Sequence, residues 1–529
     1  MEKTHPDRRS VPAAAAVWSA DNGDGTYKNP VLYADYSDPD VIRLGRDYYL
    51  TASSFTCLPG LPILHSPDLV NWTLLAHALP AYPEARFAVP QHGRGVWAPA
   101  LRHHNRLFYL YWGDPDSGVY CTRAKTPAGP WDTPVLVLTG KGIIDPCPFW
   151  DDDGRAYLVH AWAASRAGIN SLLTLRNMTA DGLRVSTTGQ HIFDGHEGHP
   201  TIEGPKVYKR NGYYYIFAPA GGVPQGWQTV LRSKTIDGPY EARIVMAQGT
   251  TPVNGPHQGG WVETPSGQSW FLHFQDAGPY GRIIHLQPMR WTNDWPVIGI
   301  DKDGKGIGEP VLTHPKPDIP GNFPRATPAD SDAFDAETLG LQWQWQANPN
   351  PAWWARIPGT AFLRLYAIPT SRDEHSLYNV PNLLLQKFPA PEFTAAAKLT
   401  LTPEQDGNRA GLIVFGQDYA CLSMTRKENR LWLTRSVCLD APSGSDEQIA
   451  EQCPLETNTV YVKVHIAAPD ARCTFSYSAD GEHFTPVGSP FMAKPGRWIG
   501  AKVGLFCVAE TPAPTGGYAD VEWFRIETP

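Results

Sequence analysis

The sequence predicts an all-β protein, in which a five-bladed β-propeller is followed by a β-sandwich. A short polar head followed by a strand rich in aromatic residues occurs five times, with the heads 48 to 59 residues apart. A repeat of about 50 strand-forming residues is typical of one four-stranded propeller blade. Later segments alternate apolar and polar residues, as the strands of a two-sheet sandwich do. No segment shows a convincing helical period.

The five heads occupy one phase of the repeat, so we expect them to meet at one mouth of the central channel. They are Asp38-Pro39, Trp97-Ala98-Pro99, Asp145-Pro146, Glu203-Gly204-Pro205 and His257-Gln258-Gly259. An Asp-Pro pair alone usually marks a turn. Residues 29–32 are expected to start the first blade, and the acidic run at 151–154 is interpreted as a solvated turn rather than a calcium loop.

The pattern divides the chain into four parts. Residues 1–25 form a lead-in, 26–315 the propeller, 316–331 a Pro-rich linker and 332–529 the sandwich. The linker is predicted because its prolines interrupt the strand periodicity.

Composition narrows the classes of function. The 529 residues include 51 Pro, 48 Gly and 19 Trp, with 19% charged residues, which favours short strands, tight turns and stacking surfaces. A net charge of −8 without a basic run argues against nucleic acid as a partner. The absence of an 18-residue apolar run argues against a membrane span. No signal peptide is visible, so a cytoplasmic or periplasmic location is expected.

Eight cysteines in a chain of this length do not predict a disulfide scaffold. Cys438 and Cys453 flank a polar loop and could face each other across a hairpin, which leaves a disulfide open. Free buried thiols are the favoured interpretation.

The heads would place Asp38, Asp145 and Glu203 at one mouth among aromatic side chains. Buried carboxylates cost several kcal/mol each unless they are paired or hydrogen-bonded, so a purely structural core would avoid this arrangement. Glycoside hydrolysis needs one carboxyl group as acid and another as base, with pKa values pushed apart by their surroundings. Flat faces for sugar rings would come from Trp97, Phe55 and Trp227. His257 would supply a hydrogen bond at the centre or act as a metal ligand there. The alternative is an internal polar network that ties the strand starts together.

The motifs that carry these residues resemble glycoside hydrolase family 43, the five-bladed propellers that act on plant polymers containing xylose and arabinose. The resemblance covers about residues 27–315 and rests on NPVLYADYSDPDVIRLGRDYYLTASSF, GVWAPAL, IIDPCPFWDDDGRAYLVHAW and TIEGPKVYKRNGYYYIFAPAGG. The rear part, with GLQWQWQANP, AGLIVFGQDYACL and GGYADVEWFRI, resembles the concanavalin-like or jelly-roll-like sandwich fused to family β-xylosidases.

The resemblance implies Asp38 as the general base and Glu203 as the general acid, with Asp145 orienting the acid and raising its pKa. It implies inversion of the anomeric configuration in one displacement. Arg282 matches an arginine that contacts sugar hydroxyls near the acid. His257 matches a histidine that orders a calcium ion through water in many relatives, so a structural calcium at the propeller centre is left open and no cofactor is required.

The chain departs from the family at Cys57, where many relatives carry an aromatic residue. Arg166 and Trp227 are expected on loops at the mouth that could compensate. Phe506 either closes the pocket from the sandwich side or belongs to the sandwich core.

The sequence therefore predicts an inverting exo-glycosidase that releases a terminal pentose, a β-D-xylosidase first. An α-L-arabinofuranosidase or a dual activity is the alternative, and a non-catalytic carbohydrate-binding protein is the alternative of another class. The expected partner is a xylo-oligosaccharide or arabino-oligosaccharide, and a homo-oligomer is left open.

Overall fold

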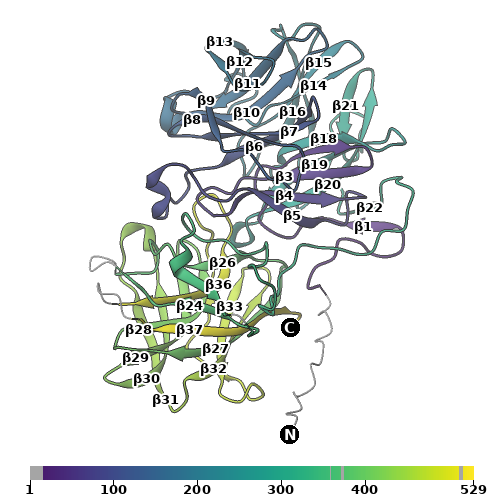
Figure 1. Ribbon diagram of the computed structural model, residues 1–529. Coiled ribbons are helices and arrows are strands. Elements are labelled where there is room, and N and C mark those ends of the chain that lie inside the picture. Colours follow the sequence, from purple (N-terminus) through teal and green to yellow (C-terminus); the bar gives the residue numbers. More distant parts are fainter. Residues whose placement is uncertain (1–15, 358, 371–374, 511–515) are drawn as a thin grey trace.

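The computed structural model describes residues 16–357, 359–370, 375–510 and 516–529. It consists of two lobes, a propeller coloured purple to teal and a sandwich coloured green to yellow (Figure 1). Among the described residues there is one α-helix, α1 (Ala164–Ala167), and the 3₁₀ turns are η1 (Ala85–Ala88), η2 (Gly278–Tyr280), η3 (Pro351–Trp353) and η4 (Ala441–Ser443). No helix in these ranges is long and apolar enough to cross a membrane.

Five four-stranded antiparallel sheets form the blades, which confirms the predicted propeller. In each blade the predicted aromatic segment is the second strand, and the polar head lies at or just before the start of the innermost strand. The strands, blade by blade, are β2 (Asp40–Leu44), β3 (Asp47–Thr51), β4 (Gly60–Ser66) and β5 (Thr73–Leu79); β6 (Trp97–His104), β7 (Leu107–Asp114), β8 (Gly118–Ala124) and β9 (Val135–Thr139); β10 (Ile143–Trp150), β11 (Ala156–Trp162), β12 (Leu172–Met178) and β13 (Val185–Asp194); β14 (Lys206–Arg210), β15 (Tyr213–Ala220), β16 (Trp227–Ser233) and β17 (Glu241–Met246); β18 (His257–Glu263), β19 (Ser269–Asp276), β20 (Arg282–Thr292) and β21 (Trp295–Ile298).

The two ends of the propeller segment meet at the fifth blade. Strand β1 (Thr26–Lys28) pairs with β22 (Thr313–Pro315), and Leu32 forms a bridge with Ile284 of β20. The Asn29 amide donates to the carbonyls of Leu286 and Val311. The prediction that residues 29–32 start the first blade was therefore wrong. These residues instead cover the last blade, where they satisfy backbone groups that would otherwise lie at a sheet edge.

The acidic run at 151–154 forms a turn, as predicted. Asp151 accepts from Lys209 Nζ at 2.5 Å and from the Tyr214 hydroxyl at 2.5 Å, so neighbouring protein groups occupy both of its oxygens.

The second domain is a sandwich of two sheets, which confirms the predicted fold class. Inward-facing residues of the two sheets alternate with outward-facing ones; along β32 the buried residues are Val460, Val462, Val464 and Ile466. One sheet contains β23 (Trp354–Arg356), β24 (Leu363–Tyr366), β37 (Tyr518–Glu527), β27 (Phe393–Thr402), β32 (Thr459–Ala467), β33 (Arg472–Ser478), β34 (Thr485–Pro486) and β35 (Phe491–Met492). The other contains β25 (Ile368–Pro369), β26 (Leu384–Lys387), β36 (Lys502–Ala509), β28 (Asn408–Phe415), β29 (Tyr419–Lys427), β30 (Arg430–Cys438) and β31 (Gln448–Leu455).

All eight cysteines are free thiols in the structure. In the strand register, Cys438 lies opposite Tyr419 and Cys453 lies opposite Leu433, so the two cysteines do not face each other across the β30–β31 hairpin. The disulfide that the sequence left open is not formed.

The two domains are joined by backbone hydrogen bonds as well as by side chains. Leu58 of the propeller and Trp345 form a β-bridge, and the Gly500 amide donates to Asp35 at 3.1 Å. His92 stacks on Tyr378 with ring centroids 3.9 Å apart. These contacts bring a loop of the sandwich to the propeller face that carries the polar heads.

Candidate active site

The backbone turns in the same unusual way at the heads of several blades. Asp38, Ala98, Asp145 and Gln258 have positive φ angles of 53°, 35°, 56° and 37°. The pairing of β6, β10 and β18 with the second strand of each blade is irregular at the same point. Left-handed residues and bulges re-aim side chains and occur most often beside functional sites. The chain thus departs from the regular sheet pattern at the same point of four blades.

Asp38, Asp145 and Glu203 are brought together at the channel mouth. Asp145 Oδ2 accepts from the backbone amide of Gly204 at 2.7 Å, which ties the third blade to the residue after Glu203. The charges of Glu203 and Asp38 both act on Asp145. Three carboxyl groups from three blades therefore share one electrostatic environment.

Asp38 is surrounded by donors. The hydroxyls of Ser37 and Ser53 donate to Oδ2 at 2.7 and 2.6 Å, and Arg282 Nη1 donates to Oδ1 at 3.0 Å. The Ser53 hydroxyl also accepts from the Ala98 amide of the next blade. This arrangement presents Asp38 as a hydrogen-bond acceptor, which is the form that a general base needs.

Arg282 lies beside Asp38, the expected base. Its Nη1 bonds Ser37 at 2.6 Å as well as Asp38, and its guanidinium lies 4.8 Å from the centre of the Phe274 ring. Its expected position near Glu203 stays a prediction. Its strand β20 belongs to the fifth blade, which in a closed ring is the neighbour of the first.

Asp145 is the most buried of the three carboxyl groups, with 2% of its surface exposed. Burial, followed by the charges of Glu203 and Asp38, raises the pKa of Asp145 well above its ordinary value. Lys206, which is fully buried, opposes this shift but makes no hydrogen bond to Asp145 through Nζ. Gln258 Nε2 donates to Asp145 at 3.2 Å.

Glu203 is the most accessible of the three, with 28% of its side chain exposed. Its Oε1 lies 2.8 Å from Nε2 of His257, a side chain that is completely buried. A neutral imidazole that donates from Nε2 leaves Nδ1 as an acceptor, and Nδ1 has no hydrogen-bond partner among the described residues. An exposed carboxyl group held from behind by a buried ring can reach a bound leaving group.

Aromatic rings from both domains line the approach to the carboxyl groups. Phe55 and Trp97 meet edge to face with centroids 6.4 Å apart, and Trp97 meets Trp498 of the sandwich at 6.3 Å. Trp498 is 44% exposed and has a positive φ of 65°. Sequence reasoning missed Trp498 because it lies in the loop before β36, where no repeat or motif marks it.

Phe506 does not close the pocket. It is 1% exposed and packs in a sandwich cluster with Ile413, Cys421 and Val508, 5.3 Å from the Arg409 guanidinium. Of the two roles that the sequence left open, the structure therefore gives it the core role. Its place in the middle of β36 points its ring into the outer face of its own sheet.

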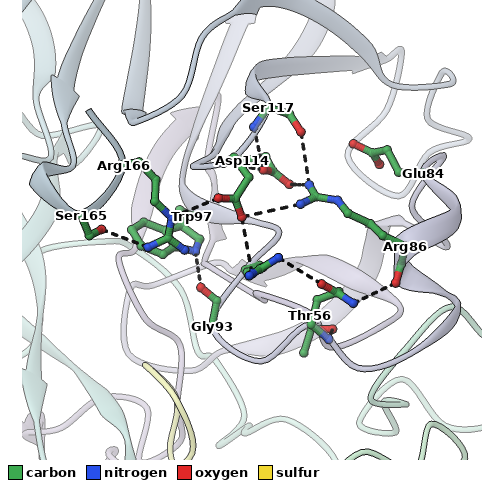
Figure 2. Close-up of polar contacts among 12 residues, drawn as sticks. Thr56, Glu84, Arg86, Gly93, Trp97, Asp114, Ser117, Ser165 and Arg166 are labelled. Atoms are coloured by element: carbon green, nitrogen blue, oxygen red, sulfur yellow. Dashed lines mark hydrogen bonds and ion pairs between the residues drawn. The ribbon is translucent and has the colours of Figure 1, made fainter. Parts of the chain in front are cut away.

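A network of charges fixes the loops around Trp97 (Figure 2). Arg166 of α1 lies 5.9 Å from the Trp97 ring and bonds Asp116 at 3.0 Å through Nε. The Trp97 indole donates to the Gly93 carbonyl at 3.0 Å. Behind these groups, Arg86 bonds the fully buried Asp114 at 2.5 Å. Arg166 thus lies beside Trp97, the first residue of the second head.

Trp227 and Cys57 occupy different surroundings. Trp227 begins β16 and pairs with Ala220, next to Pro219, whose carbonyl accepts from the Glu203 amide. Cys57 is 1% exposed, and its thiol lies close enough to Lys387 of the sandwich to act on that charge. Cys57 thus lies buried close to the domain interface, and its expected place in a wall of the sugar pocket stays a prediction.

Comparison with known families matches both domains. Residues 27–296 match the model described as glycosyl hydrolases family 43, and residues 331–527 match the model of the beta xylosidase C-terminal concanavalin A-like domain. A protein from Xylanibacter ruminicola is 40% identical over 489 residues, which are 92% of this chain and 86% of the relative.

Two further relatives carry specific names. A beta-xylosidase from Formosa agariphila is 30% identical over 99% of this chain and 93% of its own length. A non-reducing end alpha-L-arabinofuranosidase from Bacteroides ovatus is 30% identical over 94% of both chains. Among solved structures, the xylan beta-1,4-xylosidase from Bacillus halodurans superposes with a TM-score of 0.81 at 26% identity, covering 94% of this chain and 99% of that one. Two family models in the right order and relatives of matching length agree with the fold described above, and the chain belongs to glycosyl hydrolases family 43.

Proposed function

We propose that this glycoside hydrolase is an inverting exo-glycosidase that releases a terminal pentose from a xylan-type oligosaccharide, with β-D-xylosidase as its first activity. The observation that carries the proposal is the meeting of Asp38, Asp145 and Glu203 in one mouth with three different surroundings. Asp38 is held by hydroxyl donors and an arginine, Asp145 is buried, and Glu203 is partly exposed.

In this mechanism Glu203 protonates the glycosidic oxygen as the bond to the leaving group breaks. Asp38 takes a proton from a water molecule, whose oxygen attacks the anomeric carbon from the opposite face. One proton therefore enters the leaving group and one leaves the water, and the anomeric configuration is inverted.

Asp145 is a positioning residue in this proposal. Its bond to the Gly204 amide fixes the backbone beside the acid. Burial and the charge of the neighbouring Glu203 raise the pKa of Asp145 itself, so the residue that positions the acid is the one whose charge is disfavoured.

The aromatic wall supports exo action on a small sugar. Phe55, Trp97 and Trp498 enclose the approach from two domains, which favours one terminal ring over the middle of a long chain. The named Bacteroides relative favours α-L-arabinofuranosidase as the second candidate activity.

A structural calcium ion at the propeller centre is a further part of the proposal, and it fits only indirectly. His257 offers one buried nitrogen, whereas calcium prefers oxygen ligands. The described part of the chain contains no group of three or more His, Cys, Asp or Glu side chains that could hold a metal. An ion here would be held through water, and no catalytic step above uses it. Unchanged activity and melting temperature after treatment with EDTA would argue against it.

The test measures nitrophenol release from the β-D-xyloside and the α-L-arabinofuranoside, with NMR of the first-formed anomer. Glu203→Ala is expected to lose about 10²- to 10⁴-fold in kcat on either substrate. Glu197→Gln, an exposed glutamate in the loop before Glu203, is the control and should behave as the wild type. Binding of pentosides without turnover by the wild type would instead indicate a non-catalytic carbohydrate-binding protein.

A further inference from the structure

A cavity of about 640 Å³ lies on the outer face of the seven-stranded sheet of the sandwich, away from the carboxyl groups of the propeller. The strand register shows why its floor is polar. Arg409 lies opposite Thr425, and Thr434 lies opposite Gln452. Residues directly opposite each other in antiparallel strands share a face. Polar side chains on two adjacent cross-strand rows therefore extend from β28 to β31, and this surface is called the sandwich groove below.

The rest of the same face is covered. Leu377, Tyr378, Val380 and Leu383 pack over the apolar residues of the sheet and form a small second core. Leu377 also lines the sandwich groove, so the groove begins where this cover ends. The apolar half of this sheet face is therefore covered by the chain itself, whereas the polar half is open. We interpret the open half as a surface for contact with a polar molecule.

The buried positive charge on the floor of the sandwich groove is already paired, and the more exposed Asp406, Arg426 and Lys427 also line the groove. Arg409, with 6% of its side chain exposed, bonds Glu447 at 2.7 Å and Glu510 at 3.0 Å. An anion therefore finds no uncompensated positive charge on the buried part of the floor. No metal-binding group occurs in the described ranges either. The floor instead offers hydroxyls and an amide, which suit a neutral ligand with many hydroxyl groups.

Two unpartnered polar atoms point to a ligand. Thr425, which lines the sandwich groove, is 8% exposed, and its hydroxyl has no hydrogen-bond partner among the residues that the structure describes. Trp432 lies directly opposite Thr425, and its indole N–H is likewise buried without a described partner. Buried polar atoms are normally satisfied. A hydroxyl beside an aromatic ring on one face suits a sugar, which combines hydroxyls with apolar C–H faces.

The sandwich groove and the channel mouth are linked by a short series of neighbouring residues. Tyr378, which follows Leu377, stacks on His92 of the propeller. Gly93, the next residue, accepts from the indole of Trp97 at the mouth. The groove and the mouth are thus joined through two segments in contact, residues 377–378 of the sandwich and residues 92–97 of the propeller, which favours a ligand of the same class as the substrate.

We propose that the sandwich groove is a second, non-catalytic binding site for the neutral backbone of a pentose oligosaccharide. The choice of sugar class rests on the proposed function. The groove would hold a longer chain on the enzyme between cleavage events, while the propeller removes terminal residues.

The test uses calorimetry of xylohexaose and, in parallel, arabinohexaose binding to the Glu203→Ala full chain, which cannot consume them. We expect two sites per chain for at least one of the two sugars. Adding Gln452→Ala or the nearly isosteric Thr425→Val should remove the second site or weaken it about tenfold. Thr400→Val, on the outer face of the other sheet, is the matched control and should retain both sites.

The inference would be overturned if calorimetry gave one binding site per chain for both sugars, with no change in Gln452→Ala or Thr425→Val. It would also be overturned if there were two sites and neither variant affected them. Failure of the proposed function gives a different result, because it requires a wild-type chain that hydrolyses neither aryl pentoside. A second site that is lost in the groove variants would still support the groove in that case.

Discussion

Asp145 of the propeller and Glu447 of the sandwich are both largely buried carboxyl groups, but their pKa values move in opposite directions. Burial and the like charges of Glu203 and Asp38 raise the pKa of Asp145. For Glu447, burial acts in the same direction, but the Arg409 guanidinium and the Tyr419 hydroxyl outweigh it and lower the pKa. The sandwich neutralises its buried charge locally, as a structural core does. The propeller gathers like charges, which a structural core avoids and an acid–base site needs.

The contrast extends to stability. For a carboxyl group with a raised pKa, as at Asp145, the contribution to stability is complete below the pKa of the unfolded chain and is lost as the pH rises through the folded pKa. For a carboxyl group with a lowered pKa, as at Glu447, the contribution is present above the pKa of the unfolded chain and is lost as the pH falls through the folded pKa. The propeller mouth thus costs stability at neutral pH, whereas the sandwich pair supplies it.

The largest effect that would sharpen this contrast is expected from Asp145→Asn. Activity should fall by about 100-fold or more, because the charge beside the acid and the hydrogen bond that fixes its backbone both change. The free energy of unfolding should rise at pH 7 relative to the wild type, and this gain should vanish near pH 3. Kinetics on the aryl xyloside and urea unfolding at both pH values measure the two effects. An active or a destabilised variant at pH 7 would break the comparison.

Glu447→Gln should have the opposite effects to Asp145→Asn: the free energy of unfolding should fall and the activity should be kept. It leaves Arg409 with only the more exposed Glu510 as a charge partner, and breaking a buried pair costs about 3 kcal/mol. Kinetic constants on the aryl xyloside should stay within a factor of about two, since this pair lies in the other domain. Urea unfolding gives the stability. A loss of activity without a loss of stability would show that Glu447 serves the mouth.

The third prediction concerns Lys387, a buried lysine at the interface between the two domains, and the pH dependence of stability. Burial, helped by the nearby charge of Lys502, lowers the pKa of Lys387 to about 8. A lysine with a lowered pKa contributes stability at high pH that is lost as the pH falls through the folded pKa. The difference in unfolding free energy between the wild type and Lys387→Met should therefore change between pH 8 and pH 10, with the wild type gaining as the pH rises. A constant difference across this range would contradict the assignment.

The smallest effect is expected at the aromatic wall. Trp498→Ala removes one ring of the approach, and such ring contacts contribute about 1 kcal/mol, so KM should rise about fivefold with little change in kcat. Leu439→Ala, another exposed apolar side chain of the sandwich, serves as control. Equal KM values for the wild type and Trp498→Ala would mean that the propeller alone forms the sugar site.

Local patterns predicted much of this molecule. The spacing of the heads predicted five blades, and the aromatic segments after them are the second strands. The same phase predicted that Asp38, Asp145 and Glu203 meet, because a repeat places equivalent residues around one axis. Their roles as base, positioning residue and acid stay predictions that the variants above test.

Other features depended on contacts between distant segments. The prediction for residues 29–32 failed because ring closure joins them to the fifth blade, 250 residues later. Ring closure also places Arg282 of the fifth blade beside Asp38 of the first, a contact that the sequence did not predict. Phe506 and Trp498 are eight residues apart, and only the packing of the sandwich loop against Trp97 decides which one reaches the mouth.

By itself, then, the sequence determined what periodicity encodes: two all-β domains and one head per blade at a common phase, three of them with a carboxylate. Only the tertiary structure decided the surroundings of each carboxyl group, the closure of the ring, the side chain that crosses between domains and the open polar half of the sandwich sheet. The physical reason is the distance along the sequence over which each kind of interaction acts. Strand formation depends on alternation among nearby residues, whereas desolvation, charge coupling and domain contact depend on groups that the chain brings together from hundreds of residues away.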